Sequence, residues 1–422
     1  MKSLHLHVGP NIDYLRFCLR FWDEHLKGKK DNSKQDPNLR VYVQDTALHG
    51  ECDVRSGRWL QMDGWSKERV NQSRYVIGSS ELSSNPEIVD DRTIWQHVPF
   101  SMQCGQAHGE WLHFGFKGQS ASDQRASDAY SFCSTSSPLE RQIAILGFAE
   151  VHCTVRVLNS DRGMLAARLV DVWPNGSATL ITYGLLNLTH MRSHDEASVH
   201  LLKPGEEYDV TVKLHSCGYV VPKGHQLRLS LSACYWPNAW PTNKPVEMEV
   251  KLDRKKGEPC SWLTIPEVKE DTVEYKDELF TDVTNPAIGT PLEFKYLTQA
   301  QNEYTNQHDV INEAFTKTIV RDGGLRHFRE LGAAYQHRYT EKFICTKNDP
   351  ATATSQTHHE NRAQYDDVTD EEGNPIKILV TSSSELTSQG DDFQFVAEVK
   401  ASLNQEVIFE KKWNEKIGKR FI

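Results

Sequence analysis

The sequence lacks several features that would each indicate a large class of proteins. It contains no run of 18 apolar residues, the length that crosses a bilayer as a helix. Its mean hydropathy of −0.59 is also low for a membrane protein. The first residues, Met1 to His7, contain one lysine and no apolar stretch, so no secretory signal is visible. We therefore expect no contact with a membrane and a cytoplasmic location.

Paired cysteines and an excess of positive charge are absent as well. The nine cysteines are scattered, odd in number and never spaced as Cys-x-x-Cys, which argues against a zinc site and a disulfide scaffold. The net charge is −10, whereas nucleic-acid binding depends on clustered lysine and arginine. We predict no metal, no cofactor and no nucleic-acid partner, and a reducing compartment.

The 422 residues are enough for two or three domains, and the first periodic segment predicts a helix. Its apolar residues recur at steps of three and four, as on one helical face. They are Ile12, Leu15, Leu19, Trp22 and Leu26. Asn11 is a possible N-cap and Gly28 a natural stop. The polar segment 29–38 that follows is expected to be a linker.

Beyond the linker the period changes to two, which predicts β-strands. Alternation is clear in residues 208–214, 227–231 and 246–252. Asn175-Gly176 separates two further strand-like segments and predicts a hairpin, because both turn positions tolerate positive φ. Several short strands with turn signals between them indicate an antiparallel β-sandwich, which we place at residues 39–255.

The remaining residues, 256–422, show weaker strand patterns. The better ones are at 393–399 and 406–409, and we expect a β-rich extension that continues the sandwich or packs on it. The very polar stretch 347–374 is expected to be a long mobile loop. No repeat of fixed period is present, which disfavours a solenoid or a propeller.

A series of strings in consistent order carries a family resemblance. They lie at residues 9–28, 40–45, 123–125, 169–176, 183–190, 222–229, 235–241 and 409–417. Together they resemble the C-terminal portion of the X-prolyl dipeptidyl-peptidase and cocaine-esterase (CocE/NonD) family of serine hydrolases. The resemblance implies that residues 1–28 end an α/β-hydrolase domain. It also implies that the mainly β remainder contains a jelly-roll, galactose-binding-like sandwich.

The sequence departs from the family at its front. Family members carry a nucleophilic Ser, an Asp and a His before the helix matched here, so the triad is expected upstream of Met1. His5 aligns with a second His of the family, and no Gly-x-Ser-x-Gly string occurs elsewhere. We expect the chain by itself to lack a catalytic triad, the alternative being an improvised site at His5 or His7. Whether the chain belongs to an active enzyme stays open.

The resemblance implies a non-catalytic part of a hydrolase that cleaves ester or amide bonds, with dipeptidyl-peptidase activity in the family. Such a part would shape the substrate pocket and the assembly. Three alternatives remain: a carbohydrate- or ligand-binding sandwich module, a structural partner of a separate catalytic chain, and an incomplete gene model of an ordinary hydrolase.

Two sets of residues are candidates for the site. The aromatic loop with Tyr235, Trp236 and Trp240 is predicted to wall a substrate pocket, against the alternative of ordinary packing. A second set comprises Asp123, Arg125 and Asp171. These charged residues are expected to tie the backbone down through hydrogen bonds and an ion pair, the alternative being contacts with a substrate.

The helix predicts a partner. Its face of Ile12, Leu15, Leu19, Trp22 and Leu26 should pack on a hydrolase core that this sequence does not encode. Burying a large apolar side chain contributes roughly 1.5 to 3 kcal/mol. We expect the face to be covered by the sandwich, by a second copy of the chain, or by a catalytic domain or separate catalytic chain.

Overall fold

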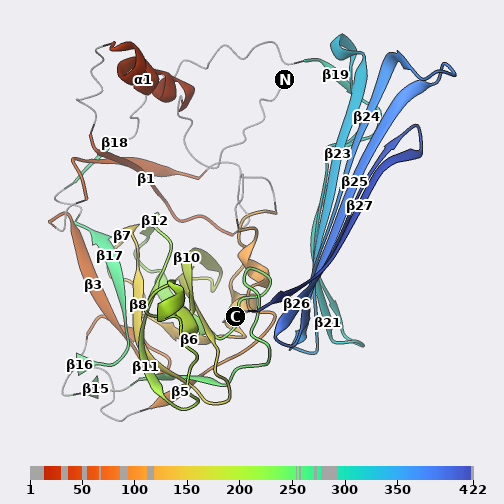
Figure 1. Ribbon diagram of the computed structural model, residues 1–422. Coiled ribbons are helices and arrows are strands. Elements are labelled where there is room, and N and C mark those ends of the chain that lie inside the picture. Colours follow the sequence, from red (N-terminus) through yellow and green to blue (C-terminus); the bar gives the residue numbers. More distant parts are fainter. Residues whose placement is uncertain are drawn as a thin grey trace. The chain divides into compact units, whose positions relative to one another are not determined.

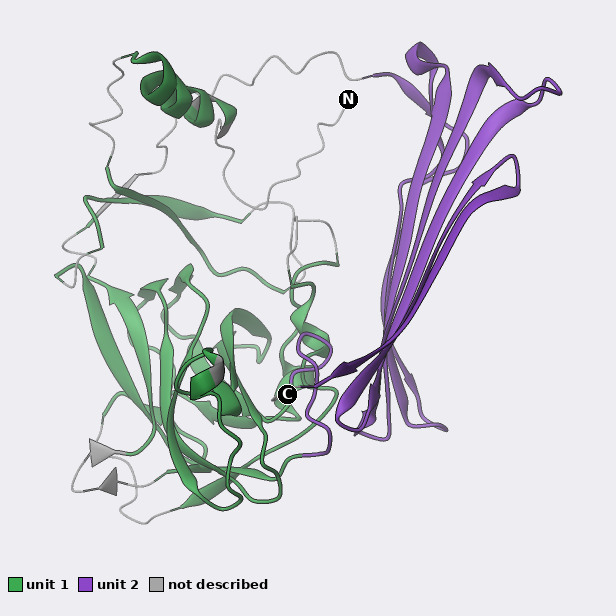
Figure 2. Ribbon diagram, viewed as in Figure 1, with its two compact units in different colours: residues 1–234, 246–287 green, residues 235–245, 288–422 purple. Residues whose placement is uncertain are grey.

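The computed structural model describes residues 14–29, 37–49, 55–65, 68–85, 94–111, 118–252, 254–255, 258–269, 273–276 and 292–419 (Figure 1). These residues form two compact units (Figure 2). Unit 1 comprises residues 1–234 and 246–287, and unit 2 comprises residues 235–245 and 288–422. Among the helices that the structure describes, none is long and apolar enough to cross a membrane.

The predicted helix is present as α1, Tyr14–Lys27. Gly28 follows it with a φ of +64°, the left-handed conformation that glycine adopts readily at a helix end. Ile12 and the proposed cap Asn11 lie outside the described residues. The large apolar side chains of α1 are exposed, as Leu19 at 58% and Leu26 at 74% illustrate.

Unit 1 is built mainly from short strands. They are β1 (Leu39–Gln44), β2 (Gly57–Met62), β3 (Val70–Ile77), β4 (Leu82–Ser83), β5 (Trp95–Val98), β6 (Phe132–Thr135), β7 (Ile143–Gly147), β8 (Glu150–Val157), β9 (Met164–Val172), β10 (Ala178–Asn187), β11 (Glu207–Lys213), β12 (Cys217–Val221), β13 (Gln226–Ser232), β14 (Met248–Lys251), β15 (Arg254–Lys255), β16 (Glu258–Pro259), β17 (Trp262–Val268) and β18 (Glu274–Lys276). Short helical turns lie between them: η3 (Gln106–His108), α2 (Arg125–Asp128), η4 (Leu188–His190) and η5 (Glu196–Ser198).

Two sheets of unit 1 form a sandwich, as the alternating segments predicted. The larger has the order β18-β2-β1-β12-β7-β17-β8-β14-β5, with β11 on β8, β3 on β17 and β4 on β3. The smaller has the order β10-β9-β13-β6. One core joins them, because Val151 and Ile265 of the larger sheet belong to the same buried cluster as Leu169 and Leu229 of the smaller.

The Asn175-Gly176 hairpin is confirmed. Strands β9 and β10 are antiparallel neighbours, and Gly176 has a φ of +85°. The Gly176 N–H donates to the Trp173 carbonyl across the turn at 2.8 Å.

The sandwich continues beyond residue 255, where we predicted it to end. Strand β17 pairs with β3 along its whole length and with β7 and β8 on its other side. Leu263 and Ile265 of β17 are fully buried. The boundary was placed too early because β17 follows a polar segment, residues 253–261, that resembles a linker.

Unit 2 contains one nine-stranded sheet. Its elements are β19 (Phe294–Tyr296), β20 (Gln301–Asp309), β21 (Ala314–Asp322), β22 (Arg326–Phe328), η7 (Arg329–Leu331), β23 (Ala333–Thr346), β24 (Asp349–Thr369), β25 (Pro375–Gln389), β26 (Asp392–Leu403) and β27 (Glu406–Gly418). The order is β19-β22-β23-β24-β25-β26-β27, with β21 on β23 and β20 on β21. All neighbours are antiparallel, and Figure 2 shows the long strands as one twisted sheet.

The prediction of a long mobile loop at residues 347–374 was wrong. Most of this stretch is β24, which pairs with β23 on one side and with β25 on the other. Polar residues fit such a strand because ladder hydrogen bonds use the backbone, whatever the side chains are. The polarity of this stretch therefore indicates that its side chains are exposed. It does not indicate that a strand is absent.

Candidate functional site

The predicted pocket-wall loop lies in unit 2 and packs on its sheet. Trp236 is 2% exposed, and its ring contacts Trp240 and Phe343 edge-on. The Trp240 ring contacts Phe393, and its N–H donates to the Ser388 hydroxyl at 3.3 Å. Tyr235 is fully buried. The pocket-wall role of Tyr235, Trp236 and Trp240 stays a prediction, and the structure gives the three residues extensive packing contacts.

Asp123 and Arg125 form a local ion pair at the start of α2. The carboxylate of Asp123 accepts from the Arg125 backbone N–H at 3.0 Å and from its Nε at 2.8 Å. Burial alone would raise the pKa of Asp123, but the hydrogen bonds from Arg125 outweigh it and lower the pKa. The contact with the backbone N–H holds the start of α2, and the structural role of the pair stays a prediction.

Asp171 lies on β9 and is completely buried. One of its oxygens is 2.8 Å from His225 Nδ1. The other accepts from the hydroxyls of Thr46 at 2.6 Å and Tyr219 at 3.0 Å. Burial, and then the charge of Asp171, raise the pKa of Tyr219. A buried carboxylate needs such donors, and this network connects strands of both sheets through β9 and β12. Among the described residues, no serine bonds to Asp171 or His225.

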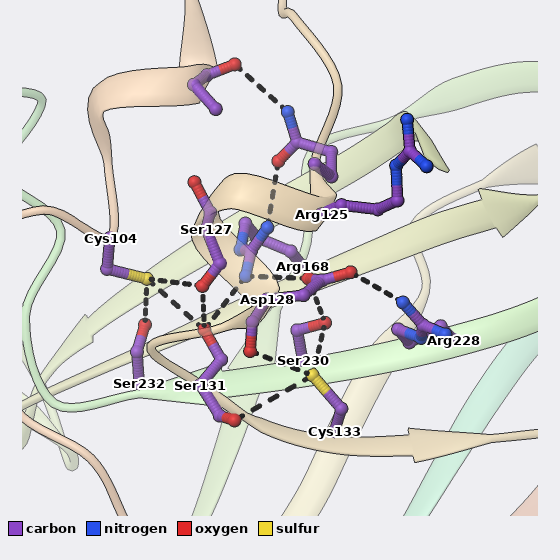
Figure 3. A network of polar contacts seen from close by, with 12 residues as sticks. Cys104, Arg125, Ser127, Asp128, Ser131, Cys133, Arg168, Arg228, Ser230 and Ser232 are labelled. Carbon is purple, nitrogen blue, oxygen red and sulfur yellow. Dashed lines mark hydrogen bonds and ion pairs between the residues drawn. The ribbon is translucent and has the colours of Figure 1, made fainter. Parts of the chain in front are cut away.

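A second buried network surrounds Arg168, which lies three residues before Asp171 on β9, and it was missed by sequence reasoning (Figure 3). Arg168 is 0% exposed. Its guanidinium donates to Gln124 at 2.8 Å and to the Ser131 hydroxyl at 2.9 Å, and it lies 3.0 Å from the Asp128 carboxylate. Arg228 and Ser230 complete the shell around that carboxylate, both at 2.8 Å.

The thiols and hydroxyls of this second network are not arranged for nucleophilic catalysis. Cys104 lies 3.3 Å from the Ser131 hydroxyl and 3.1 Å from that of Ser232 (Figure 3). Burial, with the charge of Asp128 as a second cause, raises the pKa of Cys133 and so disfavours its thiolate. Among the described residues, no histidine bonds to Ser131, Ser230 or Ser232 to act as a base. The network connects α2 to strands β6, β9 and β13.

A pocket of about 330 Å³ opens elsewhere in unit 1. Four rings line one part of it, with centroid separations of 4.3 Å for His108 and Tyr183, 4.7 Å for Tyr183 and His215, and 5.8 Å for Trp111 and His215. Trp111 is 58% exposed, and burial raises the pKa of Tyr183 to about 12. The pocket thus combines the exposed rings of Trp111 and His215 with the half-buried ring of Tyr183 and the buried ring of His108.

Charged and hydroxyl groups complete the lining. Arg55 and Glu110 supply opposite charges, and Thr179, Thr182 and Ser120 supply hydroxyls. A small number of polar groups that point into a pocket beside aromatic rings is typical of a small-molecule site. Sequence reasoning missed this pocket because its residues come from segments far apart in the sequence.

The described residues contain no group of three or more His, Cys, Asp or Glu side chains that could hold a metal ion. His358 and His359 are neighbours on β24 and so point to opposite faces of the sheet. The His359 ring stacks on Tyr339 at 5.5 Å.

Comparison with known proteins gives one family and several distant relatives. A family profile described as the X-Pro dipeptidyl-peptidase C-terminal non-catalytic domain matches residues 31–265. Two putative serine esterases, from Mycobacterium bovis and Mycobacterium tuberculosis, are each 24% identical to this chain over 239 residues. The match covers 53% of this chain and 36% of each relative, so the chain spans about a third of their length.

Comparison with solved structures gives partial matches. A CocE/NonD family hydrolase from Staphylococcus aureus is similar at a TM-score of 0.44 and 13% identity, over 60% of this chain and 46% of that one. An aminopeptidase from a marine sediment archaeon of the Thaumarchaeota is similar at a TM-score of 0.44 and 11% identity, over 60% of this chain and 43% of that one.

Proposed function

Because this chain belongs to the family of X-Pro dipeptidyl-peptidase C-terminal non-catalytic domains, we propose that it completes a serine hydrolase whose catalytic residues lie in an α/β-hydrolase domain. That domain is in the same polypeptide or in a separate chain. The hydrolase cleaves ester or amide bonds, and this chain shapes its substrate pocket and assembly. Tyr235, Trp236 and Trp240 remain candidates for the pocket wall.

The exposed face of α1 is the observation that supports this proposal. Leu15, Leu19, Trp22 and Leu26 are 54–74% exposed on one helix. Contiguous apolar surface of this kind marks an interaction site. The helix precedes the matched region 31–265, and the relatives are longer than this chain. Its partner is therefore the apolar surface of the catalytic domain.

Active-site labelling tests the proposal. The chain, tagged at its C-terminus, is purified from its native source after treatment with a biotinylated fluorophosphonate. We expect one labelled serine hydrolase domain per chain, in the same or a co-purifying polypeptide. The recombinant 422-residue chain alone should remain unlabelled, and a labelled serine within it would show that it is itself catalytic.

Variants of α1 test whether the fluorophosphonate label depends on the helix. Leu19→Asp with Trp22→Asp places two charges on the apolar face and should reduce the fluorophosphonate label per chain at least tenfold. Lys27→Ala is the matched control, because Lys27 forms an exposed ion pair with Asp23 and such pairs contribute little. Equal label in both variants would disprove the docking role of α1.

A second function, binding of a carbohydrate or similar polar ligand, is supported by the pocket at Trp111. Exposed aromatic rings beside hydroxyl groups suit sugar rings. Trp236 offers little ring surface for such a ligand because it is 2% exposed. We expect glycan-array binding, if present, to be lost in Trp111→Ala and kept in Trp65→Ala, an equally exposed tryptophan outside the pocket.

A cytoplasmic location is part of the proposal. It is supported by the eight described cysteines, none of which is joined to another of them by a disulfide. Cell fractionation with an antibody against the chain tests it, and recovery in a secreted fraction would contradict it.

A further inference from the structure

Strand β27 forms one edge of the nine-stranded sheet of unit 2. It pairs with β26, and among the described residues it pairs with no other strand. It is 13 residues long, from Glu406 to Gly418. The backbone N–H and C=O groups along its outer side form an open template for another strand.

The sequence of β27 is complementary to itself in the antiparallel direction. When Trp413 is placed opposite Trp413 of a second copy, Lys411 faces Glu415 of that copy. Glu410 then faces Lys416. By the symmetry each of these two pairs occurs twice, so four ion pairs span the junction. Opposite charges on facing residues stabilise an antiparallel strand pair, and like charges destabilise it.

Neighbouring registers bring like charges together, although the one centred on Lys411 keeps Glu410 opposite Lys412 and Glu406 opposite Lys416. In the register centred on Trp413, the apolar Phe409 and Ile417 also face each other. Centring the pairing on Lys411 or Lys412 sets a lysine opposite its own copy, and centring it on Glu410 sets two glutamates together. Slipping the pairing itself by one residue would place the side chains of the second strand on the opposite face of the sheet.

Two charged residues of β27, Lys411 and Glu415, have no opposite charge facing them on β26. They face the uncharged Val399 and Phe395, and neither forms a salt bridge among the described residues. Lys411 instead lies 4.9 Å from the ring of Trp413. A second copy of β27 would supply each with an opposite charge.

The other edge of the sheet is a natural contrast. Strand β20, Gln301–Asp309, pairs with β21 and carries Glu303 and Asp309 but no lysine or arginine. Two copies of β20 could not form cross-strand ion pairs. Lysines on an edge strand commonly prevent association because they repel one another. On β27 the lysines and glutamates are spaced so that opposite charges face each other in the antiparallel pair.

We infer that two copies of this chain associate through antiparallel pairing of their β27 strands about a two-fold axis at Trp413. The two nine-stranded sheets become one continuous sheet. This association is independent of the catalytic partner inferred for α1.

Mass measurement with charge reversal tests the register. Sedimentation equilibrium of the 422-residue chain should give twice its 48.2 kDa mass. Lys411→Glu and Glu415→Lys should each raise the dimer dissociation constant about tenfold, since each replaces two attractions by two repulsions. The double variant should restore the original value, because the charges are exchanged and still face each other.

The substituted side chains face uncharged residues within the chain, so each variant should keep its fold, which circular dichroism checks. A wild-type chain that stays monomeric at every concentration would overturn the inference. So would a double variant that associates no better than the single ones.

Cross-linking tests the axis. Facing residues have Cβ atoms about 4.5–5.5 Å apart, close to the roughly 3.5–4.5 Å of a disulfide. Trp413→Cys should therefore give an oxidised dimer beyond the level of the unsubstituted chain. Asn414→Cys should not, because it faces Lys412 of the second copy. Equal cross-linking at the two positions, or none at 413, would reject the axis.

Discussion

The two units bury their strands to very different extents. All nine residues of β9 in unit 1 are buried, whereas twelve of the thirteen residues of β27 in unit 2 are exposed. Unit 1 has a core between two sheets, and the described part of unit 2 has one sheet without a second sheet facing it. Regular strand pairing thus extends far beyond the region in which side chains are buried. Stability should follow burial, and the following experiments test that difference.

The largest effect is expected from the charge network of unit 1. Asp128→Ala leaves Arg168 buried without a carboxylate, and breaking such a pair costs about 3–5 kcal/mol of unfolding free energy. Hydrogen exchange measured by mass spectrometry should show the loss in peptides of unit 1 and not in those of unit 2. Asp123→Ala is the control, because its partner Arg125 is exposed and the cost should stay below about 1 kcal/mol. Equal losses of unfolding free energy in the two variants would show that the buried and the exposed ion pair contribute equally to stability.

A matched pair of leucines compares the two sheets directly. Leu229→Ala on β13 removes a fully buried side chain and should cost about 2–5 kcal/mol. Leu386→Ala on β25 removes a half-buried one and should cost less than about 1.5 kcal/mol. Urea unfolding followed by hydrogen exchange in each unit provides the values. A larger cost at Leu386 would mean that its face of the sheet is covered in solution.

The smallest effect concerns two tyrosines. Burial raises the pKa of Tyr183 in unit 1 to about 12, whereas a hydrogen bond with Tyr365 is the main cause that raises the pKa of Tyr335 in unit 2. The folded state holds both protons more tightly than the unfolded chain, so the stabilisation is complete below pH 10. The part due to Tyr183 is lost as the pH rises from 10 towards 12. Tyr183→Phe should reduce the loss of unfolding free energy that unit 1 shows as the pH rises above 10. An unchanged pH profile would show that the phenol is hydrated.

Alternation in the sequence predicted much of unit 1 correctly. The strands near residues 208–214 and 227–231 and the turn at Asn175-Gly176 follow from local rules that the fold obeys. Strand β24 was missed because its alternation is between polar side chains, which the hydrophobic pattern does not register.

The network around Arg168 was missed for a different reason. Its members are far apart in the sequence, as the 102 residues between Asp128 and Ser230 and the 128 residues between Cys104 and Ser232 show, and no spacing rule connects them. One signal was available: Arg168 interrupts the otherwise apolar start of β9, and a charge in a buried strand requires a partner. The same reasoning applies to Asp171, whose partners also come from distant strands.

The position of β17 has a consequence for the order in which the chain acquires its structure during synthesis. Strand β3 pairs with β17 and with the two-residue β4. It therefore waits for a strand that begins 185 residues after its own end, at Trp262. At about 5–20 residues per second, translation of that interval takes roughly 10 to 40 seconds. During this time no long strand among the described partners of β3 has been synthesised, and a chaperone bound there would protect the nascent chain until the ribosome has released β17.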